Sequence, residues 1–486
     1  MLVGGGQVSQ HDDAGLEPVE LIAGAARDAA VESGAPRLLG AVDSVRIVSI
    51  LSWRYRDPGA LAAARIGADP RHTAYSTPGG QTPQSLLSGA ARDIAAGRAD
   101  VVLIGGAEAW RTRTRLRAAE QRPQWTSEDT SVPAAEVIGG ELALAADAEL
   151  RRGIALPVQV YPVFEQALRI AAGRPMDEHL VHISELWARF STVAAGNPHA
   201  WSRQARTAEE IRTPGPDNRW IGWPYPKLMN SNNMVDQGAA VVLCSAATAD
   251  RLGVARDRWI FPLAGTDAHD TSAVTERGAL HRSPAMRIAG ARALALAGLG
   301  IDDVALVDLY SCFPSAVQVA ANELGLGLDD PARPLTVTGG LSFAGGPWND
   351  YVTHAITTMA TSLRASPPGT TGLVTANGGF LTKHAIGLYG TDPPGAGFRW
   401  EDVQDVVDRE PTTAAVADHE GPVMIEAWTV MHDRDGAPEN GIVAVRTPEG
   451  ARTWAVSRSP DVLRTLLSVD VAGAPATVDL DGTLHL

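Results

Sequence analysis

The sequence predicts an α/β protein in which helices cover both faces of the sheets. Short apolar runs typical of strands alternate with segments of helical spacing over most of the 486 residues. Residues 21–33 have helical spacing, and residues 45–50 form the first clear apolar run. Strands that alternate with helices form sheets with two buried faces. A chain of this length exceeds one ordinary core, so we expect two or three domains.

The same alternation predicts the other elements of the core from their periodicity and their flanking glycines. They are helices at 85–96, 283–297, 315–323 and 351–363 and strands at 101–104, 241–244, 304–308 and 372–376. Between the strands at 101–104 and 241–244, from roughly 111 to 225, lies a long polar, tryptophan-rich stretch with helical spacing in places, at 185–195 and 208–212. We interpret this stretch as an insertion into the α/β order.

The C-terminal part has a different composition. Residues 401–486 hold 16 acidic and 6 basic side chains, a net charge of −10, and no lysine. Four strand-like runs separated by turns predict a small acidic β domain. The domains expected from the sequence are 1–110 with 228–258 as one half, 111–227 as the inserted loop domain, 259–395 as the second half and 400–486 as the β domain.

Composition excludes several classes of protein. The net charge of −15 disfavours nucleic acid or an anionic membrane as the main partner. Two cysteines cannot form a disulfide framework, which favours a reducing compartment. No segment reaches the ~18 apolar residues that a membrane span needs, and no secretory signal is visible. We therefore expect a cytoplasmic protein. No metal-ligand spacing and no phosphate-binding loop is found.

Four short blocks carry the best functional signal. The first runs from Gly80 in Gly-Gln-Thr-Pro-Gln-Ser-Leu-Leu to Glu108 in Gly-Gly-Ala-Glu. The others are Gly339–Pro347 (GGLSFAGGP), Asp308–Phe313 (DLYSCF) and Ala376–Gly379 (ANGG). Together these blocks resemble the signature regions of the thiolase superfamily, and the resemblance covers roughly residues 1–390. The resemblance implies a five-layered α-β-α-β-α core of two similar halves with an inserted loop domain.

The resemblance also indicates which catalytic groups are missing. The nucleophilic cysteine of a thiolase aligns with Gly80, and the histidine of its Gly-His-Pro motif aligns with Gly346. The acid/base cysteine aligns with Ala376 or Asn377, depending on one residue of alignment. A thiolase acylates a low-pKa thiolate, and hydrogen-bond donors stabilise the oxyanions. We therefore expect no ordinary thiolysis or condensation, although Gly80, Tyr310, Gly346 and Ala376 should meet at one cavity.

Other side chains in the same blocks are candidates for a different chemistry. Tyr310 stands in the position of the Asn or His of the third block, and a phenol of lowered pKa acts as an acid or base. Ser311, Asn377 and His384 are the other catalytic candidates. Each also has a structural interpretation, because half-buried tyrosines and histidines often hydrogen-bond locally. Cys244 and Cys312 are interpreted as packed small residues.

In thiolases the inserted loop domain holds coenzyme A. By analogy Trp220, Trp223, Arg203 and Arg206 are candidates for contacts with its nucleotide and phosphates. Scattered tryptophans are also common packing residues. The expected ligand is a CoA thioester, with no other cofactor.

The degenerate core followed by an acidic β domain resembles the family called thiolase-like protein type 1, whose additional C-terminal domain is similar to an OB-type barrel. Three functions stay open: an acyl-CoA-binding protein, an acyl-CoA carbon–carbon lyase using Tyr310, and a scaffold whose acidic domain meets a protein partner. The acidic charge argues against nucleic acid in an OB groove. Thiolases dimerise partly through the strand before the nucleophile, here 73–80. Pro78 and two glycines weaken such pairing, which predicts a monomer or a weak dimer.

Overall fold

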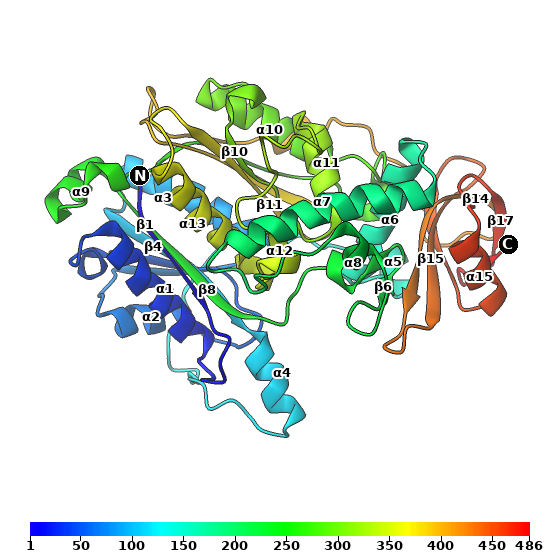
Figure 1. Ribbon diagram of the computed structural model, residues 1–486, viewed down its shortest axis with the longest axis horizontal. Coiled ribbons are helices and arrows are strands. Elements are labelled where there is room, and N and C mark those ends of the chain that lie inside the picture. The colour runs from blue at the N-terminus through cyan, green and yellow to red at the C-terminus, as the bar shows by residue number, and fades with distance from the viewer.

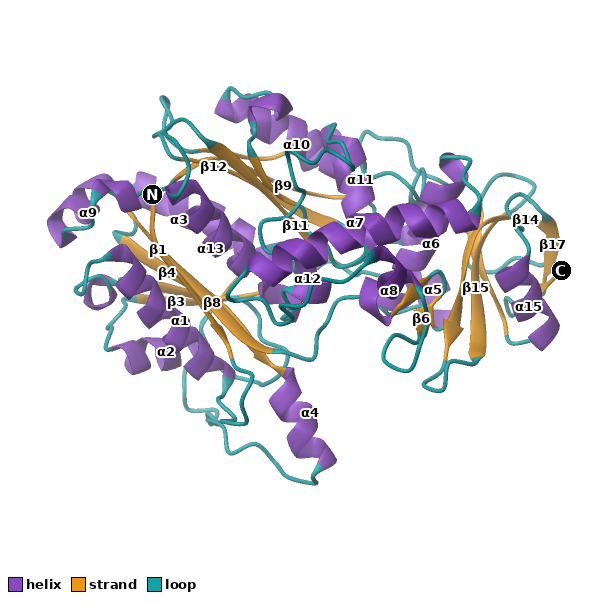
Figure 2. Cartoon of the chain, in the orientation of Figure 1, coloured by secondary structure: helices purple, strands orange, loops and turns teal.

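The computed structural model describes residues 1–486, and its core has five layers, helices–sheet–helices–sheet–helices (Figures 1 and 2). The first sheet has the strand order β1-β8-β4-β2-β3-β5. Its strands are β1 (Leu2–Ser9), β2 (Ser44–Ile47), β3 (His72–Ser76), β4 (Val101–Ala109), β5 (Glu136–Ile138) and β8 (Asp236–Cys244). Strands β2 and β3 run parallel, whereas β8 pairs antiparallel with both β1 and β4.

The second sheet has the order β10-β11-β12-β9-β13. Its strands are β9 (Phe261–His269), β10 (Leu306–Asp308), β11 (Thr371–Gly378), β12 (Lys383–Gly390) and β13 (Arg399–Asp402). Strands β11 and β12 form an antiparallel hairpin in which Asn377 faces His384 and Gly378 faces Lys383. The last strand, β13, pairs parallel with β9, so the core sheet continues past residue 395, where the sequence predicted the half to end.

Helices fill the three remaining layers. Helices α1 (Pro18–Ser33) and α2 (Pro58–Ile66) cover the outer face of the first sheet, and α10 (Pro284–Ala297) and α11 (Pro314–Leu324) lie on the outer side of the second. Helices α3 (Thr82–Ala95) and α13 (Tyr351–Arg364) contact both sheets from between them. Because these helices pack on two sides, both are buried over much of their length. The predicted α/β layering is confirmed.

The inserted segment lies beside the core and joins it to the C-terminal domain. Its elements are α4 (Trp110–Ala118), β5, α5 (Asp147–Arg151), α6 (Pro157–Ala171), α7 (Met176–Gly196), α8 (Ala208–Arg212), β6 (Trp220–Gly222) and β7 (Tyr225–Pro226). Two parts of it do not form a separate domain. Strand β5 extends the first core sheet next to β3, and β6 pairs with β14 (Gly421–His432) of the C-terminal sheet. Short helices α9 (Ala246–Leu252), α12 (Gly340–Phe343) and α14 (Gln404–Val407) complete the core.

The C-terminal domain is a mostly antiparallel sheet at one end of the molecule, in orange and red in Figure 1. It contains β14, β15 (Pro438–Arg446), β16 (Arg452–Ser457), β17 (Pro475–Val478) and β18 (Leu484–His485), with α15 (Pro460–Ser468) packed on β14 and β15. A parallel bridge between Val456 and Thr483 brings the first and last strands of the sheet together. An OB-type topology stays a prediction.

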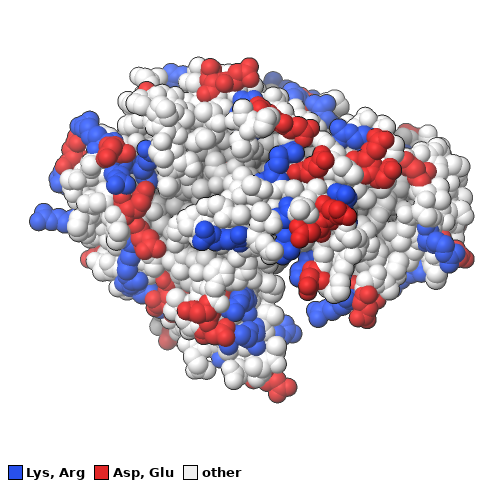
Figure 3. Space-filling model, in the orientation of Figure 1, with Lys and Arg blue, Asp and Glu red and all other residues white.

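The charged groups follow no single-sign pattern on the face in Figure 3. Acidic and basic side chains are interspersed over this face, and no continuous basic surface is seen there. Within the chain no helix has the length and apolar character that crossing a bilayer demands.

Candidate functional site

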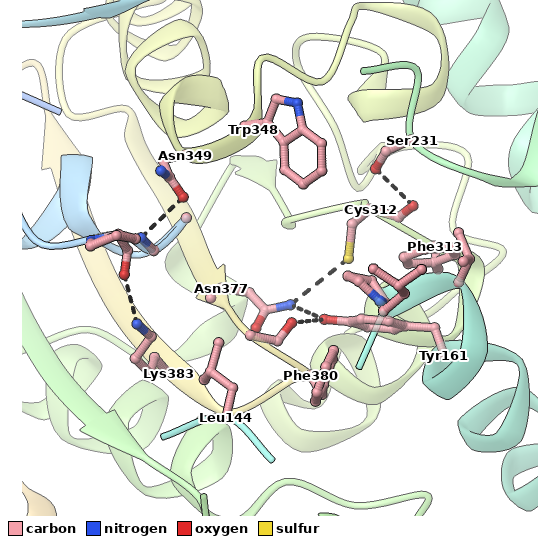
Figure 4. A pocket seen from close by; sticks show the side chains of 18 of the residues that line it. Leu144, Tyr161, Ser231, Cys312, Phe313, Trp348, Asn349, Asn377, Phe380 and Lys383 are labelled. Carbon is pink, nitrogen blue, oxygen red and sulfur yellow. Dashed lines mark hydrogen bonds between the residues drawn. The ribbon is translucent and has the colours of Figure 1, made fainter. Parts of the chain in front are cut away.

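A cavity of ≈ 750 Å³ lies where the two core sheets and the inserted segment meet (Figure 4). Its floor comes from the loop before α3, the loop before α11 and the β11–β12 turn, while residues 143–158 of the inserted segment form its outer wall. Fifteen of the 27 lining residues are hydrophobic. The polar and aromatic ones are Tyr161, Asn230, Ser231, Asn233, Tyr310, Cys312, Phe313, Trp348, Asn349, Asn377, Phe380 and Lys383.

Gly80 and Tyr310 meet on the floor of the cavity. A Cβ atom built on Gly80 would lie 2.6 Å from the Tyr310 hydroxyl and closer still to the Asn377 backbone carbonyl. The phenol therefore occupies the space in which a side chain at position 80 would begin. The Tyr310 ring is held edge-on against Tyr351 at 5.5 Å between centroids, and its backbone N–H donates to Thr375 Oγ1. Its hydroxyl has no hydrogen-bond partner within the chain.

Tyr161, from α6, connects the inserted segment to the cavity floor through hydrogen bonds. Its hydroxyl accepts from Asn377 Nδ2 and from the Leu381 N–H, both at 2.9 Å, and donates to the Gly379 carbonyl at 3.1 Å. The ring stacks on Phe313 with centroids 4.4 Å apart. Asn377 Nδ2 also lies 3.9 Å from Cys312 Sγ, whereas its Oδ1 is buried without a donor (Figure 4). An unpaired buried carbonyl oxygen is costly, so it favours a ligand that donates a hydrogen bond.

Lys383 is the one cationic side chain that lines the cavity. It begins β12, is 9 % exposed, and its Nζ donates to the Pro78 carbonyl at 2.8 Å. The Pro78 turn is itself held by Asn349, whose Oδ1 accepts from the Gly79 N–H at 3.0 Å and whose Nδ2 donates to the Ser49 carbonyl at 2.9 Å.

Burial controls the ionisation of the floor. It raises the pKa of the Cys312 thiol to about 12 and the pKa of the Tyr310 phenol well above its ordinary value. Burial likewise raises the pKa of Tyr161, with the nearby Cys312 thiol adding to the effect, and lowers the pKa of Lys383. Each shift favours the uncharged form. No aspartate, glutamate, histidine or arginine lines the cavity.

The structure brings only part of the predicted site together. Gly80, Tyr310 and Asn377 line the cavity, but Ala376 faces the hydrophobic core, because successive strand residues point to opposite faces. Gly346 does not line the cavity either. Its neighbours Asn233 and Ser231 do, and a Cβ on Gly346 would lie 2.8 Å from Asn233 Oδ1. Of the four positions expected to meet at one cavity, only Gly80 and Tyr310 line it. Asn377 takes the place expected for Ala376, and Gly346 lies outside the lining.

Two of the catalytic candidates lie elsewhere. Ser311 is fully buried beside Gly340, and its Oγ has no hydrogen-bond partner. His384 is also fully buried, at 3.2 Å from Ser283 Oγ and 3.5 Å from Asp270 Oδ2, in a cluster that holds the start of α10. Neither side chain lines the cavity. Cys244 and Cys312 are both packed in the hydrophobic core, as predicted, and Cys312 also lines the cavity floor.

The four candidates for coenzyme A contacts do not line the cavity. Trp223 stacks on Trp428 at 6.2 Å, and its carbonyl accepts from Thr429 Oγ1, so it holds the inserted segment to the C-terminal domain. Trp220 lies 6.2 Å from the His432 ring at the same junction. Arg206 is half-buried, 3.7 Å from Glu210, and Arg203 is exposed on the loop after α7.

Comparison with solved structures decides the family. A monomeric SCP2-thiolase-like protein type 1 from Mycobacterium smegmatis is 32% identical to this chain, with a TM-score of 0.84. The match covers 99% of this chain and 97% of that chain. This chain belongs to the thiolase-like protein type 1 family. Residues 402–483 match the model of the thiolase-like protein type 1 additional C-terminal domain. A search of curated proteins finds no match.

More distant structures share the fold of the family. The Ltp2-ChsH2(DUF35) aldolase is 19% identical with a TM-score of 0.61, over 79% of this chain and 96% of that chain. Human mitochondrial 3-ketoacyl-CoA thiolase is 15% identical with a TM-score of 0.58, over 80% and 98%. The core of this thiolase-like protein therefore has the thiolase fold that the sequence predicted.

Sequence reasoning missed much of the cavity lining, including Tyr161 and Lys383 on the floor, Asn349 beside them, and the outer wall. Tyr161 lies in an inserted helix that no motif marked, and only the tertiary structure brings it to Asn377. The composition could have drawn attention to Lys383, because the chain has only two lysines and the other is Lys227. The residues between 143 and 158 that line the cavity are small or aliphatic and carry no pattern that separates them from an ordinary loop.

Proposed function

We propose that this protein binds an acyl-CoA thioester, with the acyl group in the cavity, and that it does not carry out thiolysis. The observation that supports binding is the shape and lining of the cavity. Its volume falls in the usual range for ligand pockets, and its lining is mostly apolar with a few polar groups on the floor. These are the features of a site that buries a hydrocarbon chain and orients one polar head group.

The floor argues against thiolase chemistry. The nucleophile position is Gly80, and Tyr310 fills the space where its side chain would begin. The remaining thiol, Cys312, stays protonated near neutral pH because burial raises its pKa to about 12, and a thiol is a poor nucleophile. No histidine or carboxylate lines the cavity to act as a base.

Calorimetric titration with acyl-CoA esters of increasing length tests the binding proposal. Each methylene that becomes buried contributes about 0.8 kcal/mol, so affinity should rise roughly fourfold per added methylene until the cavity is full. A parallel assay should detect no loss of acetoacetyl-CoA in the presence of free CoA. Chain-length-independent binding, or turnover near that of a working thiolase, would contradict the proposal.

The predicted phosphate contacts can be tested separately. Arg203 and Arg206 stay proposals for the nucleotide end, since neither belongs to the cavity. Changing both to alanine should weaken binding of acyl-CoA and leave binding of the matched acyl-pantetheine unchanged. Equal losses for both ligands, or none for either, would remove these arginines from the proposal.

A carbon–carbon lyase is the second candidate, favoured by the Tyr310 hydroxyl, which lines the cavity without a partner in the chain. Because burial raises its pKa, Tyr310 rests as the protonated phenol. It would protonate the leaving carbon as the C–C bond breaks, and its phenolate would take up the proton that the β-hydroxyl group loses. The remote aldolase shares only the fold. Incubation with β-hydroxyacyl-CoA esters should release aldehyde or ketone from the native protein and much less from Tyr310→Phe. If the native protein releases no aldehyde or ketone, the lyase proposal is wrong and only the binding proposal remains.

We also propose that the protein is a monomer. The edge of β3 is occupied by β5 of the same chain, with Ala74 opposite Glu136 and Ser76 opposite Ile138. A strand whose edge is already paired cannot pair with its twin. The related mycobacterial protein is described as monomeric. Light scattering should give 51.0 kDa, and a stable species of twice that mass would contradict the proposal.

The acidic C-terminal domain is proposed to reject nucleic acid and to remain available to a protein partner. Its net charge of −10 repels phosphate. Fluorescence anisotropy with single-stranded DNA and RNA at physiological salt should detect no binding at micromolar protein.

A further inference from the structure

Lysine is almost absent from this chain. Of 41 basic residues, 39 are arginines and two are lysines. Lys227 is exposed on a short helical turn of the inserted segment, whereas Lys383 is 9 % exposed on the floor of the cavity. The chain therefore uses arginine nearly everywhere that a cation is needed and places a primary amine in its main cavity. Arginine and lysine differ in one property that matters here, since only the amine loses its proton readily.

The surroundings of Lys383 contain no counter-ion. Its Nζ donates one hydrogen bond, to the Pro78 carbonyl at 2.8 Å, and the residue takes part in no ion pair. The titratable groups that line the same cavity are Tyr161, Tyr310 and Cys312, and burial raises the pKa of all three, so they are uncharged near neutral pH. On the neighbouring strand β9, His269 stands opposite Lys383, and its Nδ1 bonds to the Asp270 carbonyl.

Such an environment favours the neutral amine. An ammonium that is removed from water and left without an anion is costly, so burial lowers the pKa of Lys383. A lysine that is desolvated in an apolar pocket is an activated nucleophile. The backbone of the cavity floor also lies close to the Lys383 side chain. A Cβ on Gly378 would be 3.2 Å from Lys383 Cε and 3.2 Å from the backbone nitrogen of Gly80, so the lysine side chain runs past the same stretch of floor that contains Gly80.

We propose that Lys383 is a nucleophilic amine that forms a reversible imine with a ketone or aldehyde carbonyl of the ligand bound in the cavity. The neutral amine attacks the carbonyl carbon, a C=N bond replaces the C=O bond, and the oxygen leaves as water with the two protons that the nitrogen gives up. Addition of water reverses the step, so no oxidant or reductant is needed. The ligand class follows from the proposed acyl-CoA function: a 3-oxoacyl thioester carries such a ketone beside its thioester. Tyr310, which stays protonated in the same cavity, is the proposed proton donor to the oxygen.

Reductive trapping tests the proposal. The native protein is incubated near neutral pH with 2-decanone, or with decanal at low concentration, in the presence of cyanoborohydride, and labelled peptides are mapped by mass spectrometry. The chain offers three amines: Lys383, exposed Lys227 and the Met1 amine, which is buried against the Cys244 carbonyl outside the cavity. We expect the adduct on Lys383. The neutral fraction of an amine rises about tenfold per unit of pKa lowering, so labelling of Lys383 should begin at lower pH than labelling of Lys227.

Matched variants separate the amine from its charge. Lys383→Met removes both, Lys383→Arg keeps the cation without a nucleophile, and Lys227→Met is the control. Trapping should vanish in both variants at 383 and persist in Lys227→Met. Decanoyl-CoA, which has no ketone, should bind the native protein and Lys227→Met within about threefold of each other. Its affinity for the two variants at 383 is measured alongside, so that each loss of trapping is compared with the binding that the variant retains.

Each result decides between the two proposals. No adduct at Lys383 in a protein that binds decanoyl-CoA would overturn the imine and keep the binding function. An adduct at Lys383 without any acyl-CoA affinity would keep the amine and overturn the acyl-CoA proposal. Labelling of Met1 or Lys227 as fast as Lys383 would mean unspecific reactivity and would overturn the imine. Trapping that survives in Lys383→Arg would do the same.

Discussion

The floor and the outer wall of the cavity differ in the residues that form them and in how far those residues are buried. The floor comes from core loops and holds buried polar groups, such as the Asn377 Oδ1 and the Lys383 amine, that the chain itself leaves partly unpaired. The outer wall comes from the inserted segment and exposes leucines, with Leu150 at 53% and Leu156 at 56%. Unpaired polar groups and exposed apolar surface both cost free energy. A ligand with a polar head and a hydrocarbon tail would relieve both costs at once.

The difference also predicts where changes are tolerated. The floor backbone is tightly held, because the Tyr161 hydroxyl bonds to Asn377 and Leu381 and no free space surrounds Gly80. The wall is less constrained, because two of its leucines, Leu150 and Leu156, are more than half exposed. Substitutions on the floor should therefore act on stability first, and substitutions on the wall on affinity first.

The largest effect is expected for Gly80→Cys. Its Cβ would collide with the Asn377 carbonyl and the Tyr310 hydroxyl. Overpacking of this kind costs roughly 3 kcal/mol of unfolding free energy, and the new thiol should show no thiolase activity. Chemical denaturation and an acetoacetyl-CoA assay measure the two outcomes. Gly89→Ala, in the following helix α3, is the control, since its Cβ would meet only Arg46 Nη1 at 3.4 Å. A stable, active Gly80→Cys protein would show that the floor is not rigid.

A comparable effect is expected from the titration of Glu108. Its carboxylate accepts from the backbone N–H groups of Leu51 and Ser52, and Leu51 lines the rim of the cavity. Burial raises the pKa of Glu108 to about 7, from 4.5. The folded state thus holds the proton more tightly, so this group's stabilisation is complete below pH 4.5 and is lost as the pH rises to about 7. The loss amounts to about 3 kcal/mol at most.

Denaturation midpoints measured from pH 4.5 to 8 check the sign. Glu108→Gln should flatten the profile over this window, because the amide does not titrate. If the midpoint of the native protein instead rises over this pH range, and Glu108→Gln has the same profile, the pH dependence belongs to other carboxyl groups.

A smaller effect separates the two tyrosines of the floor. Tyr161→Phe leaves the Asn377 amide and the Leu381 N–H without their acceptor, which should cost about 2 kcal/mol. Tyr310→Phe removes a hydroxyl that has no partner in the chain and should change stability by less than about 0.5 kcal/mol. Urea denaturation of both variants measures the contrast. Equal losses would mean that Tyr310 is also a structural hydrogen-bond donor.

The smallest change in stability is expected on the wall. Leu156→Ala should leave the unfolding free energy within about 0.5 kcal/mol, because the side chain is 56% exposed. It should weaken binding of a long acyl-CoA by roughly fivefold, since about 1 kcal/mol of burial is lost. Val31→Ala, on an exposed face of α1, is the control. Unchanged affinity in Leu156→Ala would place the acyl chain away from this wall.

Local periodicity was enough to predict the core, and short motifs were enough to predict its family. The helix expected at 351–363 is observed as Tyr351–Arg364, and the strand expected at 372–376 as Thr371–Gly378. These elements are buried against neighbours on both sides, so their apolar spacing is strict and can be read directly. The inserted segment was harder to interpret, because its helix Pro157–Ala171 carries polar residues such as Glu165 that pair only in the folded chain.

The sequence by itself determined that position 80 carries no nucleophilic side chain, because the identity of a residue is independent of the fold. It also determined the α/β order and the acidic character of the C-terminal part. Only the tertiary structure decided what replaces the missing side chain, namely Tyr310 on the floor, and that Tyr161 and Lys383 join it from segments far apart in the chain. It also decided that β5 covers the edge of β3. The physical reason is that local spacing records which face of an element is buried, whereas contacts between distant segments depend on how complete elements pack.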